Sequence, residues 1–295
     1  MTSAVLLMAH GTPASIDEMP EYLRLVRGGR PPSPELLAEM RRNYEAIGGR
    51  SPLTELTFAQ ADALAARLGA RAGVAVGMRN WRPFIKDAIA GLASRGATRI
   101  VGVPMAPQYS TVSVQKYLDA AASSLPDGVR FEAVPSFHAH PLLAEAFAER
   151  LTAAAPGDDE LVIFTAHSIP TRVADGGDRY CAEVAETARL VAARSGIARY
   201  ELAYQSAGRT PEPWIGPSLK DTIQDRAAAG VRRFVVAPIG FVCDHTEILF
   251  DIDLEAAAVA RERGASLRRT ESLNTSPPFI AMLEDVVQPL LNADC

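Results

Sequence analysis

Two kinds of side chain in this sequence could carry out chemistry together: one histidine and a row of carboxylates further along the chain. His167 follows the apolar segment Leu161–Thr165 after a single alanine. The carboxylates Glu247, Asp251 and Glu255 are spaced four residues apart. Imidazole binds metal ions and exchanges protons near neutral pH, and carboxylates bind hard divalent cations. The combination predicts a site that handles a divalent cation, protons or both.

Each group also has an ordinary structural interpretation. An α-helix would place the three carboxylates one above another on a single face, and like charges so placed weaken a helix by about 0.2–0.5 kcal/mol per pair. A solvated acidic face is therefore the alternative for the row, and a histidine held by hydrogen bonds within its loop is the alternative for His167. The row favours function because apolar residues occupy its other faces, namely Ile248, Leu249, Ile252 and Leu254.

The elements that must position these groups alternate along the chain. Short and almost uninterrupted apolar runs predict buried parallel strands at Val5–Ala9, Arg99–Pro104, Leu161–Thr165 and Phe234–Pro238. Helix-like stretches separate them at Leu56–Leu68, Phe84–Arg95, Leu142–Ala153, Asp178–Arg194 and Leu219–Ala229, with a last helix at Phe279–Leu291. Such alternation predicts an α/β fold with parallel sheets.

The chain also repeats itself in part. Ile85–Ile89 leads through a glycine to the run at Arg99–Pro104, and Leu219–Ile223 leads in the same way, at the same spacing, to Arg233–Pro238. Met8–Pro13 likewise resembles Thr165–Pro170, with Ala-His after a strand and a proline three residues after the histidine. Coincidence between two ordinary helix–strand units is the alternative to a duplication.

We interpret the repeat as two similar Rossmann-like lobes, residues 1–154 and 155–295, with the last helix packing back on the first lobe. Ligands of such sheets bind beyond the carboxyl ends of the strands. His10, His167 and the segment Pro238–Glu247 all follow strands in this way. They are therefore expected to face a common cleft between the lobes.

Composition excludes several classes of function. The 295 residues carry a formal net charge of -5, which argues against nucleic acid as the main partner. The three cysteines form no CxxC pair, so neither a disulfide framework nor an iron–sulfur site is expected, and a reducing cytoplasm suits them. No apolar run approaches the roughly 20 residues that span a bilayer, so no integral membrane segment is expected.

Two loops and one basic cluster could shape a binding site. Tyr44–Leu53 and Tyr204–Pro217 are rich in glycine, proline and polar residues, but neither contains a phosphate-binding GxGxxG pattern or a GxSxG nucleophile turn. Ordered surface loops are the alternative for both. Arg24, Arg27 and Arg30 could clamp substrate carboxylates, although solvated charge near a helix end is the favoured interpretation of the cluster taken alone.

Taken in order, several motifs resemble the ferrochelatase family nearly from end to end. They are Ala9-His10-Gly11-Thr12-Pro13, Tyr44–Leu53, Pro107-Gln108-Tyr109-Ser110-Thr111, Thr165-Ala166-His167-Ser168-Ile169-Pro170, Tyr204–Pro217, Pro238-Ile239-Gly240-Phe241 and Asp244-His245-Thr246-Glu247. No single fragment decides the matter, but the series in this order is highly specific.

The resemblance implies a chelatase that inserts ferrous iron into a porphyrin in haem biosynthesis, with the porphyrin between the lobes. His167 and Glu247 would face each other as catalytic residues, with Asp251 and Glu255 continuing the metal site. The soluble, monomeric branch that acts on coproporphyrin III is most similar. Iron would be a substrate, and neither a tightly bound cofactor nor an iron–sulfur cluster is expected. The mechanism implied has His167 contact the metal first and accept a proton, while the protein holds the ring bent.

The porphyrin contacts implied by the resemblance are His10, Arg27, Tyr44, Ser51 and Tyr117. The sequence departs from that branch at two positions. His10 stands where a tyrosine is usual, although imidazole can also ligate haem iron, and Asn43 stands where an arginine is frequent. These departures leave coproporphyrin and protoporphyrin IX both open as substrates. A non-catalytic cytoplasmic haem or metal carrier and a cobalt chelatase with two histidines at the metal are the other hypotheses.

Overall fold

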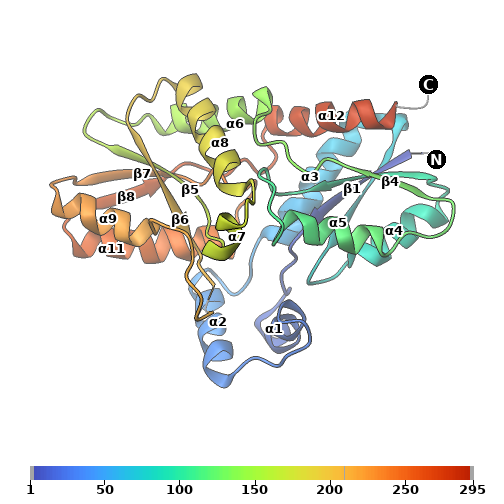
Figure 1. Ribbon diagram of the computed structural model, residues 1–295, viewed down its shortest axis with the longest axis horizontal. Helices are drawn as coiled ribbons and strands as arrows, with labels where there is room; N and C mark the ends of the chain where they lie inside the picture. The colour runs from blue at the N-terminus through green and yellow to red at the C-terminus, as the bar shows by residue number, and fades with distance from the viewer. Residues whose placement is uncertain (1–2, 209, 293–295) are drawn as a thin grey trace.

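The computed structural model describes residues 3–208 and 210–292 and shows two α/β lobes side by side (Figure 1). Each lobe contains a four-stranded parallel sheet, in the order β2-β1-β3-β4 in the first and β6-β5-β7-β8 in the second. The strand order of the second sheet is thus the same as that of the first, with each strand number raised by four. This is the order expected if the two lobes arose from one duplicated unit. The strands are β1 Ser3–Ala9, β2 Gly73–Met78, β3 Arg99–Pro104, β4 Arg130–Ala133, β5 Leu161–His167, β6 Tyr200–Gln205, β7 Arg233–Ala237 and β8 Ser266–Arg269.

The predicted strands are the four central ones, and they are confirmed. β1, β3, β5 and β7 are buried along nearly their whole length because helices cover both faces of each sheet. The four edge strands escaped prediction because half-buried and exposed residues interrupt their apolar pattern. One boundary was also wrong: His167 does not follow β5 but is its last residue, paired with Gln205 of β6.

The predicted helices are confirmed to within three residues at each end. They correspond to α3 Leu53–Leu68, α4 Ile85–Ser94, α6 Pro141–Ala154, α8 Tyr180–Ser195, α9 Leu219–Ala228 and α12 Pro277–Leu291. The other α-helices of the described chain are α1 Met19–Val26, α2 Pro34–Ala46, α5 Val114–Ala122, α7 Thr171–Asp175, α10 Thr246–Leu249 and α11 Ala257–Glu262. The short helical turns are η1 Ile16–Glu18, η2 Gly69–Arg71 and η3 Asp251–Ala256, the last a π-helix.

A single apolar core joins the lobes on the side away from α1 and α2. Alternate residues of the central strands supply it, such as Leu7 of β1 and Phe164 of β5, both fully buried. Leu283 of α12 belongs to the same cluster, because α12 crosses to the first lobe and packs against α3, α6 and β3 (Figure 1). The opposite strand faces point into separate cores, one for each lobe. The lobes are thus held together by burial of apolar surface and do not depend on polar contacts alone.

The carboxyl ends of β1 and β5 point toward the boundary between the lobes. His10 follows β1, and His167 ends β5. Below this boundary, α1 and α2 form a projection that the loop after β1 leads into (Figure 1). Its own small core consists of Met19, Leu23 and Tyr44. None of the helices in the described ranges combines the length and apolar character needed to cross a membrane.

Candidate active site

The carboxylate of Glu247 lies between two imidazoles. Its Oε1 is 3.5 Å from Nε2 of His167, and its Oε2 is 3.6 Å from Nε2 of His245. His245 is turned toward it by its own Nδ1, which lies 3.0 Å from the carbonyl oxygen of Cys243. The facing pair of His167 and Glu247 that the sequence predicted is thus assembled from β5 and α10, and His245 is an addition to it.

Hydrogen bonds to His167 and to the strand that ends with it fix its position. Its Nδ1 lies 2.5 Å from the carbonyl oxygen of Ser168, so Nδ1 carries the proton and Nε2 is left to face Glu247. The buried Tyr180 of α8 donates its hydroxyl to the carbonyl oxygen of His167 at 2.9 Å. Gly240, in the loop after β7, donates its backbone N–H to the carbonyl oxygen of Thr165 at 3.1 Å.

Gly240 is required at this position because the two backbones approach so closely. A Cβ on Gly240 would lie 2.7 Å from both Cα and Cβ of Ala166, the residue before His167. We therefore expect Gly240→Ala to lower the free energy of unfolding by about 1–3 kcal/mol, the usual range for overpacking, and to lower turnover more than tenfold by displacing His167. Thermal unfolding and iron-insertion assays measure the two effects.

Gly91→Ala is the matched control for that substitution. A Cβ on Gly91 in α4 would meet only the end of Arg95, at an ordinary 3.5 Å. Alanine should therefore raise stability by up to about 1 kcal/mol without changing turnover. Equal activities for Gly240→Ala and Gly91→Ala would show that the end of β5 tolerates the extra methyl group.

The histidine and the carboxylate change each other's protonation. Burial lowers the pKa of His167, but the charge of Glu247 and the hydrogen bonds to Glu247 and Ser168 outweigh it and raise this pKa to about 9. Burial raises the pKa of Glu247, while the charges and hydrogen bonds of His167 and His245 hold it well below its ordinary value. The two side chains remain 35% and 40% exposed, so solvent reaches the pair. At neutral pH it is therefore an imidazolium facing a carboxylate.

The acidic row continues from Glu247 through a π-helix and not through the regular α-helix that was predicted. In η3 the N–H of Glu255 donates to the carbonyl oxygen of Phe250 at 2.9 Å, five residues back. The wider turn changes the spacing on which a straight α-helical face depends, so that part of the prediction was wrong. The carboxylates of the row still interact electrostatically. Burial raises the pKa of Asp251 to about 6, and the charges of Glu247 and Glu255 act in the same direction.

The strand β6 and the loop after it hold this row against the rest of the site. Gln205 donates its side-chain N–H to the carbonyl oxygen of Glu247 at 2.8 Å. Ser206 donates its hydroxyl to Asp251 while its backbone has a φ of 59°, a conformation that generally costs about 1–3 kcal/mol outside glycine. At the outer end, Glu255 pairs with Lys220 of α9 at 3.2 Å. Asp251 is thus fixed near the pair, and Glu255 lies toward solvent.

His10 of the first lobe reaches the same site. Its Nδ1 lies 3.1 Å from the carbonyl oxygen of Gly11 and 3.2 Å from the hydroxyl of Tyr22. Burial, followed by the charge of Arg79, lowers the pKa of His10 to about 4, although the carboxylate of Glu247 acts in the opposite sense. His10 is therefore neutral at pH 7, and the contact to Gly11 places its proton on Nδ1. Its Nε2 lone pair is the one available to a metal.

The four remaining residues predicted to contact porphyrin are placed differently from one another. Tyr44 is buried in α2, where the charge of Glu247 contributes to raising its pKa to about 12 after burial itself. Tyr117 of α5 is buried beneath the guanidinium of Arg79, 5.3 Å from its ring centre. Ser51 is buried and accepts the N–H of Leu53 at 3.4 Å, a contact at the start of α3. Arg27 is exposed at the end of α1.

Sequence reasoning missed several residues of this site. His245 was quoted only as part of a motif, and its contact with Glu247 depends on how the loop after β7 turns. Tyr22 and Arg79 surround His10, yet they come from α1 and from the end of the unpredicted edge strand β2. Gln205 ends β6 and Ser206 follows it, both within the stretch Tyr204–Pro217, whose glycine-, proline- and polar-rich composition is the signal that could have found them. In the described parts of the chain, no three carboxylate, imidazole or thiol groups are already placed to hold a metal ion.

Comparison with known proteins identifies the group to which this site belongs. The model of the family described as Ferrochelatase matches residues 2–291. The ferrochelatase of Deinococcus radiodurans is 41% identical over 298 residues, which cover 96% of this chain and 94% of the relative. The coproporphyrin III ferrochelatase of Bacillus subtilis is 36% identical over 297 residues, with 96% of each chain covered.

Solved structures share the fold at much lower identity. The sirohydrochlorin chelatase SirB from Bacillus subtilis subspecies spizizenii, in complex with cobalt, has a TM-score of 0.62 and 12% identity, covering 100% of this chain and 97% of SirB. CbiX, the terminal enzyme of siroheme biosynthesis in denitrifying bacteria, has a TM-score of 0.55 and 16% identity, with 97% and 98% covered. Because the sequence match extends over almost the whole chain, this protein belongs to the ferrochelatase family, the lyases that insert a metal ion into a porphyrin.

Proposed function

We propose that this protein inserts ferrous iron into coproporphyrin III, with the ring held between His10 of the first lobe and His167 of the second. The observation that carries the proposal is the Glu247 carboxylate held between two imidazoles at the end of β5. Insertion must release two pyrrole protons while a dication arrives. A site for it therefore needs a metal contact and a proton acceptor on one side of the ring, and this group supplies both.

The proton on the His167–Glu247 pair links metal arrival to proton release. Nε2 of His167 can contact Fe²⁺ only after losing its proton, so metal binding expels one proton from the pair. When the metal moves on to the ring nitrogens, that Nε2 lone pair becomes free again. With a pKa of about 9 it is then a base strong enough to take a pyrrole proton at neutral pH. His167 thus serves as first metal contact and as proton acceptor in turn.

Insertion releases two pyrrole protons, so a second proton acceptor is needed besides His167. The acidic row offers it. Asp251 has a pKa of about 6, close enough to neutrality to accept a proton and give it up again. It lies next to Glu247 in the row, and Glu255 continues toward solvent beside Lys220. We assign protons and incoming metal to this path. His10, neutral and with its Nε2 free of a proton, is assigned to the opposite face of the ring, where it can ligate product iron.

Coproporphyrin III is proposed as the preferred ring because relatives at 36–38% identity carry that substrate in their names. Relatives at 39–41% identity are named as ferrochelatases without a stated porphyrin. Iron enters as substrate, and no resident cofactor is part of the proposal. We place the activity in the cytoplasm, because Fe²⁺ and the free thiols of Cys181 and Cys243 both suit a reducing compartment. A monomer is proposed as well, since the two lobes of one chain supply both sides of the site.

The test is anaerobic turnover with ferrous iron and each of two porphyrins, coproporphyrin III and protoporphyrin IX. We expect insertion into both, with at least tenfold higher kcat/KM for coproporphyrin III. A preference for protoporphyrin IX would overturn the substrate assignment and leave the chelatase activity standing. Tight haem binding without insertion into either ring would replace the enzyme with a haem carrier.

A further inference from the structure

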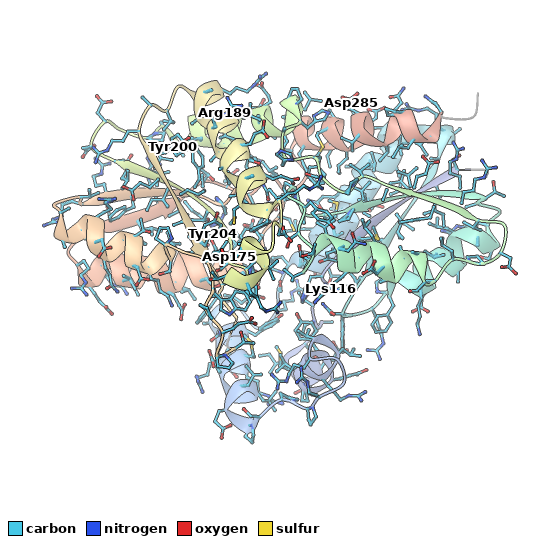
Figure 2. The ribbon with its side chains drawn as sticks, in the orientation of Figure 1. Lys116, Asp175, Arg189, Tyr200, Tyr204 and Asp285 are labelled. Carbon is cyan, nitrogen blue, oxygen red and sulfur yellow. The ribbon has the colours of Figure 1, made fainter. Side chains whose placement is uncertain are left out.

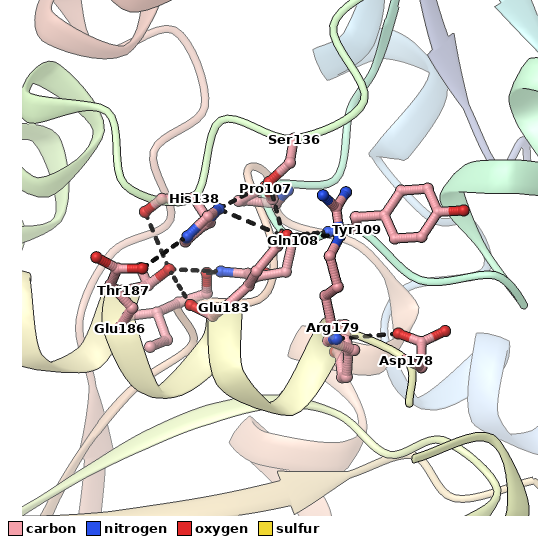
Figure 3. Close-up of polar contacts among 12 residues, drawn as sticks. Pro107, Gln108, Tyr109, Ser136, His138, Asp178, Arg179, Glu183, Glu186 and Thr187 are labelled. Atoms are coloured by element: carbon pink, nitrogen blue, oxygen red, sulfur yellow. Dashed lines mark hydrogen bonds and ion pairs between the residues drawn. The ribbon is translucent and has the colours of Figure 1, made fainter. Parts of the chain in front are cut away.

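Apart from the shared apolar core, polar contacts join the lobes beside the proposed porphyrin site. Asp178, just before α8, and Glu183, in the first turn of α8, belong to the second lobe. Glu183 accepts hydrogen bonds from Tyr109 and Ser136 of the first lobe (Figure 3). Asp178 accepts hydrogen bonds from Ser110 and Thr111 of the same lobe. We refer to these six residues as the inter-lobe clamp.

Asp178 divides its two carboxylate oxygens between the lobes. Its Oδ2 accepts three hydrogen bonds from the first lobe, from the hydroxyl of Ser110 at 3.1 Å and from the N–H and hydroxyl of Thr111 at 2.7 Å each. Its Oδ1 accepts the N–H of Tyr180 at the start of α8, at 2.9 Å. The same Tyr180 donates its hydroxyl to the carbonyl oxygen of His167. One side chain therefore connects the metal-side strand to the opposite lobe.

On the first lobe the clamp holds the start of α5. The carbonyl oxygen of Ser110 accepts the N–H of Gln115 in the first turn of that helix at 3.1 Å. Tyr117 lies in the next half-turn, beside Arg79 and within the field of Glu247. Movement of Ser110 and Thr111 away from Asp178 would thus shift the start of α5, and Tyr117 with it, relative to the second lobe.

Glu183 fixes the orientation of the clamp. Its side chain is 8% exposed, and its Oε2 accepts the N–H of Tyr109 and the hydroxyl of Ser136, each at 2.7 Å. Arg179 pairs with its Oε1 at 3.3 Å and stacks over the ring of Tyr109, 4.5 Å from the ring centre. A buried carboxylate that loses such donors is strongly disfavoured, so the two segments are held in one register.

Apolar packing reinforces this edge of the boundary only in part. A cavity of about 640 Å³ opens beside the clamp, between Tyr109, Thr111 and Gln115 of one lobe and Arg172, Asp178 and Arg179 of the other. The apolar core that joins the lobes reaches this edge at Val173 and Tyr180, with the half-buried Val112 packed against it, and continues from there to Leu7, Phe164 and α12. Loss of the clamp would therefore leave the lobes joined by apolar packing while removing the polar contacts that set the position of this edge.

We propose that Asp178 is a positioning residue for metal insertion, which sets the spacing between the Tyr117 side of the porphyrin site and His167. This inference rests on the proposed function, since it requires a porphyrin between these two residues. To hold a porphyrin ring bent, the two sides of the site must stay at a fixed separation. The free energy that strains the ring must come from binding contacts away from the reacting nitrogens. Asp178 acts through Ser110, Thr111 and Tyr180, and it contacts no reacting atom.

The decisive variant is Asp178→Asn. Asparagine keeps the shape of aspartate but has only one side-chain oxygen. That oxygen can accept a hydrogen bond either from the N–H of Tyr180 or from the first lobe. In both cases the amide NH₂ then faces the remaining hydrogen-bond donors, with which it cannot pair. We expect kcat for iron insertion to fall about tenfold while KM for the porphyrin changes less than threefold, since a misplacement well under 1 Å suffices for such a loss. The Soret band of bound iron-free porphyrin should shift toward its position for the free, planar ring.

Two further variants separate positioning from folding. Asp175→Asn, on α7, changes an exposed aspartate three residues away from Asp178 and should match the parent protein in kcat and Soret position (Figure 2). Thr111→Val removes one donor of the clamp from the opposite lobe and should lower kcat in the same sense. The double variant Asp178→Asn with Thr111→Val should lose no more than Asp178→Asn alone, because both changes break one contact.

Each possible result for these variants has a distinct meaning. A kcat within twofold of the parent protein for Asp178→Asn, with an unchanged Soret band, overturns the proposal. If that variant does not fold, Thr111→Val decides, and a normal kcat for it overturns the proposal equally. Failure of the unmodified protein to bind any porphyrin is a different result, which removes the proposed function and this inference with it.

Discussion

Replacing Glu247 by glutamine should lower kcat for iron insertion about 10²–10³-fold, the range expected when a positioned proton-transfer group is lost. Glutamine has the same shape and can still meet His167 and His245, which lie 3.5 Å and 3.6 Å from the carboxylate. It carries no charge, so it neither raises the pKa of His167 nor attracts the incoming dication. Anaerobic steady-state kinetics with saturating porphyrin measures the effect.

A second acidic residue of the same region provides the comparison. Glu262 lies exposed near the end of α11, outside the acidic row, and Glu262→Gln removes the same charge from the protein as a whole. Its kcat should stay within twofold of the parent value. If Glu247→Gln also retained kcat within threefold, the carboxylate between the two imidazoles would have no part in proton transfer.

Metal uptake should depend steeply on pH through His167. Below a pKa of about 9 the imidazole is protonated, so a metal ion must displace the proton. The affinity for a divalent ion such as Co²⁺ should therefore rise about tenfold per pH unit from pH 6 to about 9 and level off above it. In Glu247→Gln the plateau should begin at lower pH, because the charge that raises the pKa of His167 is gone. Isothermal titration calorimetry across this range tests both curves.

His167→Ala should weaken Co²⁺ binding and abolish its pH dependence in this range, and kcat should fall at least about 10²-fold with it. His140→Asn is the corresponding control. His140 caps α6 through the N–H of Leu142 and pairs with Asp285 of α12, and asparagine is itself a good N-cap. This variant should reproduce the parent pH curve. A pH dependence that survived in His167→Ala would place the metal contact on another residue.

The sequence by itself determined the frame of the protein. The central strands β1, β3, β5 and β7 could be found because strands buried on both faces are apolar without interruption. Two motifs that recur in the same order in both halves of the chain predicted two lobes of similar structure. His167 was found from its position at a strand end, and Glu247 from its four-residue spacing to further carboxylates. These features are local, so a single stretch of chain is enough to show them.

Only the tertiary structure decided how the site is completed. His245 joins Glu247, Arg79 approaches His10, and Ser206 holds Asp251 through contacts between segments distant in sequence. The edge strands that bring in Arg79 and Ser206 gave no clear pattern, because glycines interrupt the apolar run of β2 and polar residues interrupt that of β6. The π-helix also could not be read from spacing, because its extra residue per turn depends on how η3 packs against the sheet. Side-chain chemistry was therefore visible in the sequence, whereas the distances and electrostatic fields that tune it arise only when the two lobes meet.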